Sequence, residues 1–132
     1  DIEVGGGGKF LSAGERQLIS FGRALARDSK IIVMDEPTAH IDIASDDKIQ
    51  AIVRNSFKNR TVITIAHRLS TIIDYDKVLV MDDGRVGEFG CACSLLANPH
   101  GLLTSMVESC GKEQAKKLKA QATEKYNKSK DD

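Results

Sequence analysis

The stretch KIIVMDEPT, Lys30 to Thr38, decides the fold. Residues 31 to 34 are continuously apolar and rich in β-branched side chains, which is typical of a strand buried on both faces of a parallel sheet. Pro37 prevents a regular continuation of that strand. Asp35 and Glu36 therefore stand at the carboxyl end of a buried strand, where open α/β sheets bind their ligands.

A second apolar stretch, TVITIAH, predicts another buried strand from Thr61, and His67 follows it. Residues 45 to 57, between the two strands, have the spacing of a helix. If the strands are parallel, both strand ends converge on one crevice and His67 approaches Asp35. The alternative for His67 is a turn histidine that only binds backbone groups.

The residues before the first strand, SAGERQLISFGRALARD, predict a helix that begins at Ser12 and ends near Asp28. Ser12 followed three residues later by Glu15 is a capping-box pattern. A helix start also offers backbone amides and a favourable dipole to an anion. Ser12 and Gly14 are therefore candidate phosphate ligands, and a purely capping role for Ser12 is the alternative that can hold at the same time.

The second half of the chain adds short elements. Leu69 to Asp74 predict a helix, and KVLVMDDGRVGEFG predicts a hairpin that turns at Asp83 and Gly84. Two helical segments, SLLANP and HGLLTSMVES, follow. The order of these elements predicts an α/β fold with a parallel sheet core, flanking helices and a C-terminal hairpin.

The last segment differs in composition. From Gly111 the large apolar residues disappear apart from Leu118 and Tyr126, and lysines outnumber acidic residues. We expect one domain over residues 1–111 and a lysine-rich tail over 112–132, a solvated helix that frays into disorder. Contact of the lysines with anionic lipid headgroups is the less favoured alternative.

Composition excludes several classes. The 132 residues have a formal net charge of zero, which gives no sign of nucleic-acid binding. No apolar run approaches the roughly 20 residues that span a bilayer. Cys91, Cys93 and Cys110 match neither a disulfide framework nor a zinc site and are expected to be free thiols. The start at Asp1 suggests a piece of a longer chain.

The glycines at 5 to 8, followed by Lys9, are a misleading signal. A phosphate-binding P-loop needs a preceding buried strand and a hydroxyl residue directly after its lysine, but here Phe10 follows. We interpret these glycines as a flexible loop that leads to Ser12.

Three segments together identify a family resemblance. The chain resembles the C-terminal half of an ATP-binding cassette (ABC) ATPase domain over roughly Ile2 to Gly111. The segments that carry the resemblance are, in order, LSAGERQLISFGRALA, IIVMDEPTAHID and TVITIAHRLSTI. LSAGE resembles the signature LSGGQ, IIVMDE the Walker B strand, the segment ending in Asp42 the D-loop, and His67 the switch histidine. The resemblance implies a partial P-loop NTPase-type cassette whose P-loop half is absent and would lie before Asp1.

The resemblance also implies roles. Asp35 would hold the Mg²⁺ shell, Glu36 would be the general base, and His67 would contact the γ-phosphate of ATP. Asp42 would lie across a dimer interface.

Ser12, Gly14 and Glu15 would face the nucleotide held by a partner domain. Two positions depart from the family pattern, Ala13 where glycine is usual and Glu15 where glutamine is usual. An added methyl crowds an approaching anion. A carboxylate repels a triphosphate unless the capping box occupies it.

Three segments resemble the corresponding segments of exporters: AHRLSTI around the switch histidine, the hairpin, and LLANPHGLLTSMVESCG. They are most similar to the second nucleotide-binding domain of subfamily C, the multidrug-resistance-associated group. A bacterial-type exporter half is the nearest competitor. The implied function is ATP hydrolysis that powers export, with ATP and Mg²⁺ as cofactors. The implied partners are a second nucleotide-binding domain, arranged head to tail, and the transmembrane domains of the same transporter, at the cytoplasmic face of a membrane.

Two alternatives belong to other classes. One is a soluble ABC ATPase that acts on DNA or ribosomes, and the other is a non-hydrolysing regulatory or interaction cassette, which Ala13 and Glu15 favour. Without a P-loop, we expect the chain alone to bind ATP feebly and to be inactive as an ATPase.

Overall fold

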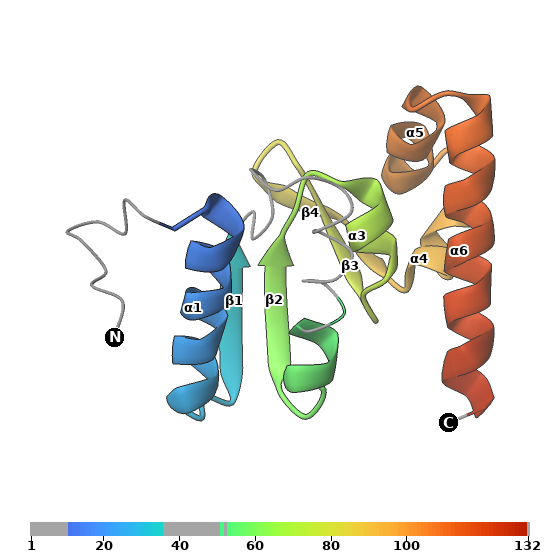
Figure 1. Ribbon diagram of the computed structural model, residues 1–132. Coiled ribbons are helices and arrows are strands. Elements are labelled where there is room, and N and C mark those ends of the chain that lie inside the picture. Colours follow the sequence, from blue (N-terminus) through green and yellow to red (C-terminus); the bar gives the residue numbers. More distant parts are fainter. Residues whose placement is uncertain (1–10, 36–50, 52, 132) are drawn as a thin grey trace. The chain divides into compact units, whose positions relative to one another are not determined.

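The computed structural model describes residues 11–35, 51 and 53–131 (Figure 1). The chain divides into two compact units, Asp1–His67 and Arg68–Asp132, and each is described by itself.

The first unit opens with helix α1, Ala13–Ala26. Ser12 is its N-cap, as the capping-box pattern predicted, and the helix ends two residues before Asp28. Asp28 has a φ of 50°, a left-handed conformation that an aspartate tolerates better than most residues. This residue reverses the chain direction after α1 and leads it into the first strand.

Strands β1, Ile31–Asp35, and β2, Thr61–Ile65, form the parallel sheet that the sequence predicted. The register runs from Ile31 opposite Thr61 to Asp35 opposite Ile65 without a shift. Residues 51 and 53–56 of the predicted connecting helix are helical.

The core of the first unit lies on one face of this sheet. Helix α1 and the helical residues before β2 cover that face; the buried side chains are Phe21, Ile32, Met34, Val53 and Phe57. On the opposite face Ile31 and Val33 are 63% and 67% exposed. The prediction that β1 is buried on both faces is therefore wrong for the described residues, because helices cover the sheet from one side only.

The second unit begins with helix α3, Leu69–Ile73, followed by strands β3, Val78–Asp82, and β4, Arg85–Gly90. The two strands form the predicted antiparallel hairpin. Asp83 and Gly84 form its turn with φ angles of 44° and 71°, the pair of positive values that a two-residue hairpin turn of type I′ needs.

Three further helices complete the second unit: α4, Ala92–Leu96, α5, Leu102–Ser109, and α6, Lys112–Asp131. The first two begin at residues shifted by two positions from the predicted segments. None of the helices in the described part of the chain is long and apolar enough to cross a membrane.

Helix α6 supplies part of the second unit's core. One of its faces packs with α3, α4 and α5. The buried side chains of the cluster that it joins are Ile73, Val78, Ala92, Leu103, Val107, Ala115, Leu118 and Ala122. Lys112, Lys116 and Lys117 lie on the exposed side. The tail is thus helical through Asp131, and it is solvated on one side only.

Candidate functional site

Three element ends meet at one end of the first unit: the start of α1 and the carboxyl ends of β1 and β2 (Figure 1). Asp35 ends β1 and lies opposite Ile65, the last residue of β2. His67 follows two residues later, and both Asp35 and His67 are exposed. The parallel register thus brings these two predicted site residues to the same edge of the sheet.

The start of α1 is capped by a reciprocal pair of hydrogen bonds between Ser12 and Glu15. The Glu15 amide donates to the Ser12 hydroxyl oxygen at 3.2 Å, and the Ser12 amide donates to Glu15 Oε2 at 2.7 Å. The hydrogen bond that the Ser12 backbone amide donates to the Glu15 carboxylate, followed by one from the Ser12 side chain, lowers the pKa of Glu15 below its usual value. Glu15 is therefore a carboxylate at neutral pH, and its charge is directed at its own helix.

This capping box leaves binding capacity at the helix start. The Ser12 hydroxyl also hydrogen-bonds the Glu15 carboxylate, so it can donate to another anion only when it turns away from Glu15. The amide of Gly14, at the second helical position, is among the donors that a helix leaves without an intrahelical partner. An added Cβ at Gly14 would meet nothing within 4 Å, so the space beside it is open. The capping role of Ser12 is observed, and its role as a phosphate ligand stays a prediction.

The fit to Mg²⁺ depends on Asp35. Among residues 11–35, 51 and 53–131, no group of three or more histidines, cysteines and acidic residues is placed to hold a metal ion. Mg²⁺ is commonly bound by one or two carboxylates together with waters and substrate phosphates. The exposed Asp35 carboxylate suits an ion that arrives with a nucleotide, and the described residues form no cage for an ion alone.

Two of the predicted site residues, Glu36 and Asp42, lie outside the described residues. The remaining five, Ser12, Gly14, Glu15, Asp35 and His67, belong to the first unit.

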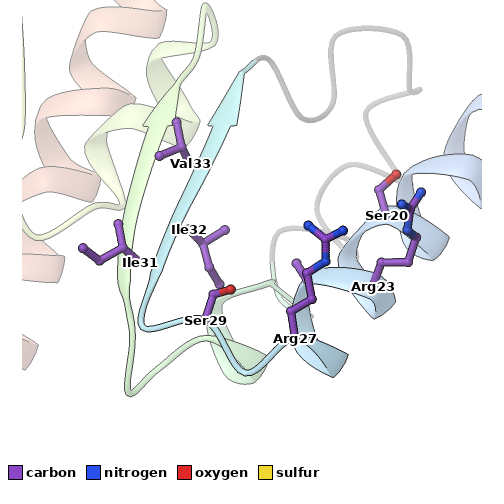
Figure 2. Close-up of a pocket in the computed structure, with 8 residues that line it drawn as sticks. Ser20, Arg23, Arg27, Ser29, Ile31, Ile32 and Val33 are labelled. Carbon is purple, nitrogen blue, oxygen red and sulfur yellow. The ribbon is translucent and has the colours of Figure 1, made fainter.

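A hollow of about 310 Å³ lies along α1 and β1, away from the predicted residues (Figure 2). Arg23 of α1 and Arg27, the C-cap of that helix, line it on one side, and Ile31, Ile32 and Val33 line it from β1. None of the predicted site residues lines this hollow. The spacing of Arg23 and Arg27 could have indicated a basic surface there, because residues four positions apart lie on the same face of a helix.

The chain is similar to much longer transporter sequences. It is 47% identical over 125 residues to ABC transporter C family member 3 of Dictyostelium discoideum and 48% identical over 134 residues to the ATP-dependent bile acid permease of Saccharomyces cerevisiae. It is 53% identical over 96 residues to mouse ATP-binding cassette sub-family C member 2. These alignments cover 95%, 98% and 73% of the chain. The chain belongs to the ABC transporter family. The resemblance found in its motifs, including the one to subfamily C, is confirmed.

The fold of this ABC family member agrees with that assignment. A bacterial Atm1-family ABC exporter, solved with ATP bound, matches 85% of the chain with a TM-score of 0.73 and 39% sequence identity. No protein-family model matches the chain. The chain spans only 9%, 8% and 6% of the three relatives and 19% of the exporter chain. The α/β fold class predicted from the sequence is confirmed.

Proposed function

We propose that this chain is part of the nucleotide-binding domain of an ABC exporter and takes part in the ATP hydrolysis that powers transport. The observation that carries the proposal is the register of the sheet, which brings Asp35 and the strand that leads to His67 to one edge. The start of α1, with the Gly14 amide, lies at the same end of the first unit. The family membership supports the same function.

In this proposal the residues at the carboxyl ends of β1 and β2 contact the phosphate that is cleaved from ATP. Asp35 holds Mg²⁺ through its waters, and the ion, when bound, neutralises charge on the phosphate oxygens. Glu36 accepts the proton of the attacking water, and His67 hydrogen-bonds the γ-phosphate and fixes that water. Each role needs a side chain at the carboxyl ends of adjacent strands, and β1 and β2 provide this arrangement for Asp35 and His67.

The helix start serves a different nucleotide. The Ser12 hydroxyl and the Gly14 amide donate to the phosphates of ATP held by a second nucleotide-binding domain. Glu15 caps the start of α1 beside them. Asp42 lies at the interface between the two domains, which are arranged head to tail. The other partners are the transmembrane domains of the same transporter, with this chain at the cytoplasmic face and no nucleic acid involved.

A non-hydrolysing regulatory cassette is the second candidate, and the Glu15 carboxylate favours it. A fixed negative charge at the helix start weakens the attraction of that helix end for a phosphate. A soluble ABC ATPase has no such support, because the relatives in the comparison are transporters.

The test uses a full-length transporter in which this chain replaces the matching segment of the yeast relative, which is similar over 98% of the chain. Glu36→Gln should lower the ATPase rate by about 10²-fold or more while nucleotide still binds, because a general base contributes that much. Glu113→Gln, at an exposed position of α6, is the matched control and should retain the parental rate. Hydrolysis at the parental rate in Glu36→Gln would reject Glu36 as the base. A chimera that binds ATP without hydrolysing it would favour the regulatory cassette.

A further inference from the structure

A groove of about 560 Å³ lies in the second unit where helices α5 and α6 pack together. Its lining residues are Glu108 of α5 and Lys112, Ala115, Lys116 and Lys119 of α6. Ala115 belongs to the buried core of the unit and forms an apolar part of the wall. The charged side chains of the groove are therefore three lysines and one glutamate.

The three lysines form one stripe along α6. Lys112, Lys116 and Lys119 are spaced four and then three residues apart, so they lie on the same face of the helix. Lys119 Nζ donates to Glu108 Oε1 at 3.0 Å, and this pair balances one of the charges. In the part of the chain that the structure describes, neither Lys112 nor Lys116 forms an ion pair. The groove thus carries two positive charges that are not balanced.

The stability of α6 does not account for these two lysines. Lys112 is the first residue of α6, and the helix dipole opposes a cation near a helix N-terminus. Lys112 and Lys116 are four residues apart, a spacing at which like charges repel one another. Lys125 and Lys128, further along α6, are instead paired with acidic side chains at 3.1 and 2.7 Å. The unbalanced charge in the groove is therefore unfavourable for the helix alone and suits a ligand of opposite charge.

An acidic peptide fits this groove better than a membrane surface does. Helices that bind membranes insert large apolar side chains that lie beside their lysines. In α6, Leu118 is 2% exposed and packs in the core, so it cannot insert into a bilayer. The spacing also fits a peptide. Lys112 and Lys116 are about 6 Å apart along the helix axis, and alternate residues of an extended chain are about 6.6 Å apart.

We propose that the groove between α5 and α6 binds a short acidic segment of a partner protein. The segment is extended, and carboxylates on alternate residues face Lys112 and Lys116, while Ala115 contacts its backbone. Each contact is an exposed ion pair, so the binding is weak and falls as the salt concentration rises. This interaction is separate from ATP hydrolysis and does not depend on the proposed function.

The test uses the 132-residue chain and a labelled hexapeptide in which serine and glutamate alternate. Fluorescence anisotropy at low ionic strength should show binding at least about tenfold tighter than that of a counterpart peptide with glutamine in place of glutamate. Lys112→Gln combined with Lys116→Gln should weaken binding of the glutamate peptide about tenfold, because both proposed contacts are lost. Lys112→Arg combined with Lys116→Arg keeps both charges and should retain the parental affinity.

The matched control removes two lysines of the same helix outside the groove. Lys125→Gln combined with Lys128→Gln changes the net charge equally and should leave the affinity for the glutamate peptide within about twofold of the parent. Equal losses in the two glutamine pairs would overturn the proposal, because they would show attraction to the whole helix. So would a failure of the parent chain to distinguish the two peptides, or a parental affinity in the Lys112 and Lys116 variant.

Vesicles that contain phosphatidylserine test the alternative partner. We expect the chain to bind the glutamate peptide more tightly than it binds these vesicles, because α6 presents a groove and inserts no apolar side chain. Binding to the vesicles that requires Lys112 and Lys116, without binding to the peptide, would overturn the proposal in favour of a lipid surface.

Discussion

The carboxylate of Glu88 accepts a hydrogen bond from the amide of Leu103 at 2.9 Å, and its other oxygen accepts one from the amide of Leu102 at 3.0 Å. The end of the hairpin thus caps the start of α5, whose own N-cap residue, Gly101, has no side chain. An added Cβ on Gly101 would lie 2.7 Å from Glu88 Oε1, so the glycine makes room for the cap.

We expect Glu88→Ala to lower the free energy of unfolding of the 132-residue chain by about 2 kcal/mol or more, because hydrogen bonds to a charged group contribute about 1.5–3 kcal/mol each. Urea unfolding followed by circular dichroism measures this. Glu124→Ala is the control, since the pair of Glu124 with Lys128 is exposed, and it should have a far smaller effect. Equal losses in the two variants would contradict a capping role for Glu88.

Residues close in sequence explain much of what could be predicted. The capping box of Ser12 and Glu15 predicted the start of α1, and the Asp83–Gly84 pair predicted the hairpin turn, because each signal acts over a few residues. The parallel pairing of β1 and β2 was predictable from the order of strand, helix and strand along the chain.

Two side-chain contacts between distant segments could not be predicted. The cap from Glu88 spans 14 residues and the Gln121 bond to Asp74 spans 47, and no local pattern marks either pair. The exposure of Val33 depends on which elements cover each face of the sheet, which an apolar run alone does not determine.

The packing of α6 gives a second prediction. Leu118 is 2% exposed, so Leu118→Ala should cost about 2–5 kcal/mol of unfolding free energy, as for other buried leucines. Lys117→Ala, the exposed neighbour, is the control and should change stability little. A negligible effect of Leu118→Ala would show that residues 112–131 behave as a tail and do not contribute to the core.

The conformation of the hairpin turn gives a third prediction. Gly84 has a φ of 71°, and an added Cβ would meet nothing within 4 Å, so substitution is opposed by backbone conformation alone. Gly84→Ala should therefore cost about 1 kcal/mol in urea unfolding. Gly84→Asn, which tolerates the left-handed region better, should cost less. The reverse order of the two variants would contradict a backbone origin of the effect.

The capping box of α1 predicts a dependence on pH. Hydrogen bonds from Ser12 lower the pKa of Glu15 in the folded chain below 4.5, so its contribution to stability is complete above the unfolded pKa. That contribution is lost as the pH falls through the lower folded value. The difference in urea midpoint between the parent chain and Glu15→Ala should thus be present at pH 7 and shrink at pH 3. In a Ser12→Ala background the difference should be smaller at pH 7, since the two residues form one unit. A difference that stays constant from pH 7 to pH 3 would rule out the box as its source.

The last prediction is that the chain alone binds ATP weakly. At the start of α1 and the end of β1, the Gly14 amide and the Ser12 hydroxyl are the predicted phosphate donors, while Glu15 and Asp35 add negative charge. Two neutral donors beside two carboxylates do not hold a triphosphate tightly, and the proposed function gives them a nucleotide bound elsewhere. Titration of the 132-residue chain with fluorescent ATP and Mg²⁺ should show no saturation below about 1 mM, which corresponds to a binding free energy weaker than about −4 kcal/mol. The full-length chimera, titrated under the same conditions, is the positive control. Micromolar binding by the chain alone would mean that it contains a nucleotide site of its own.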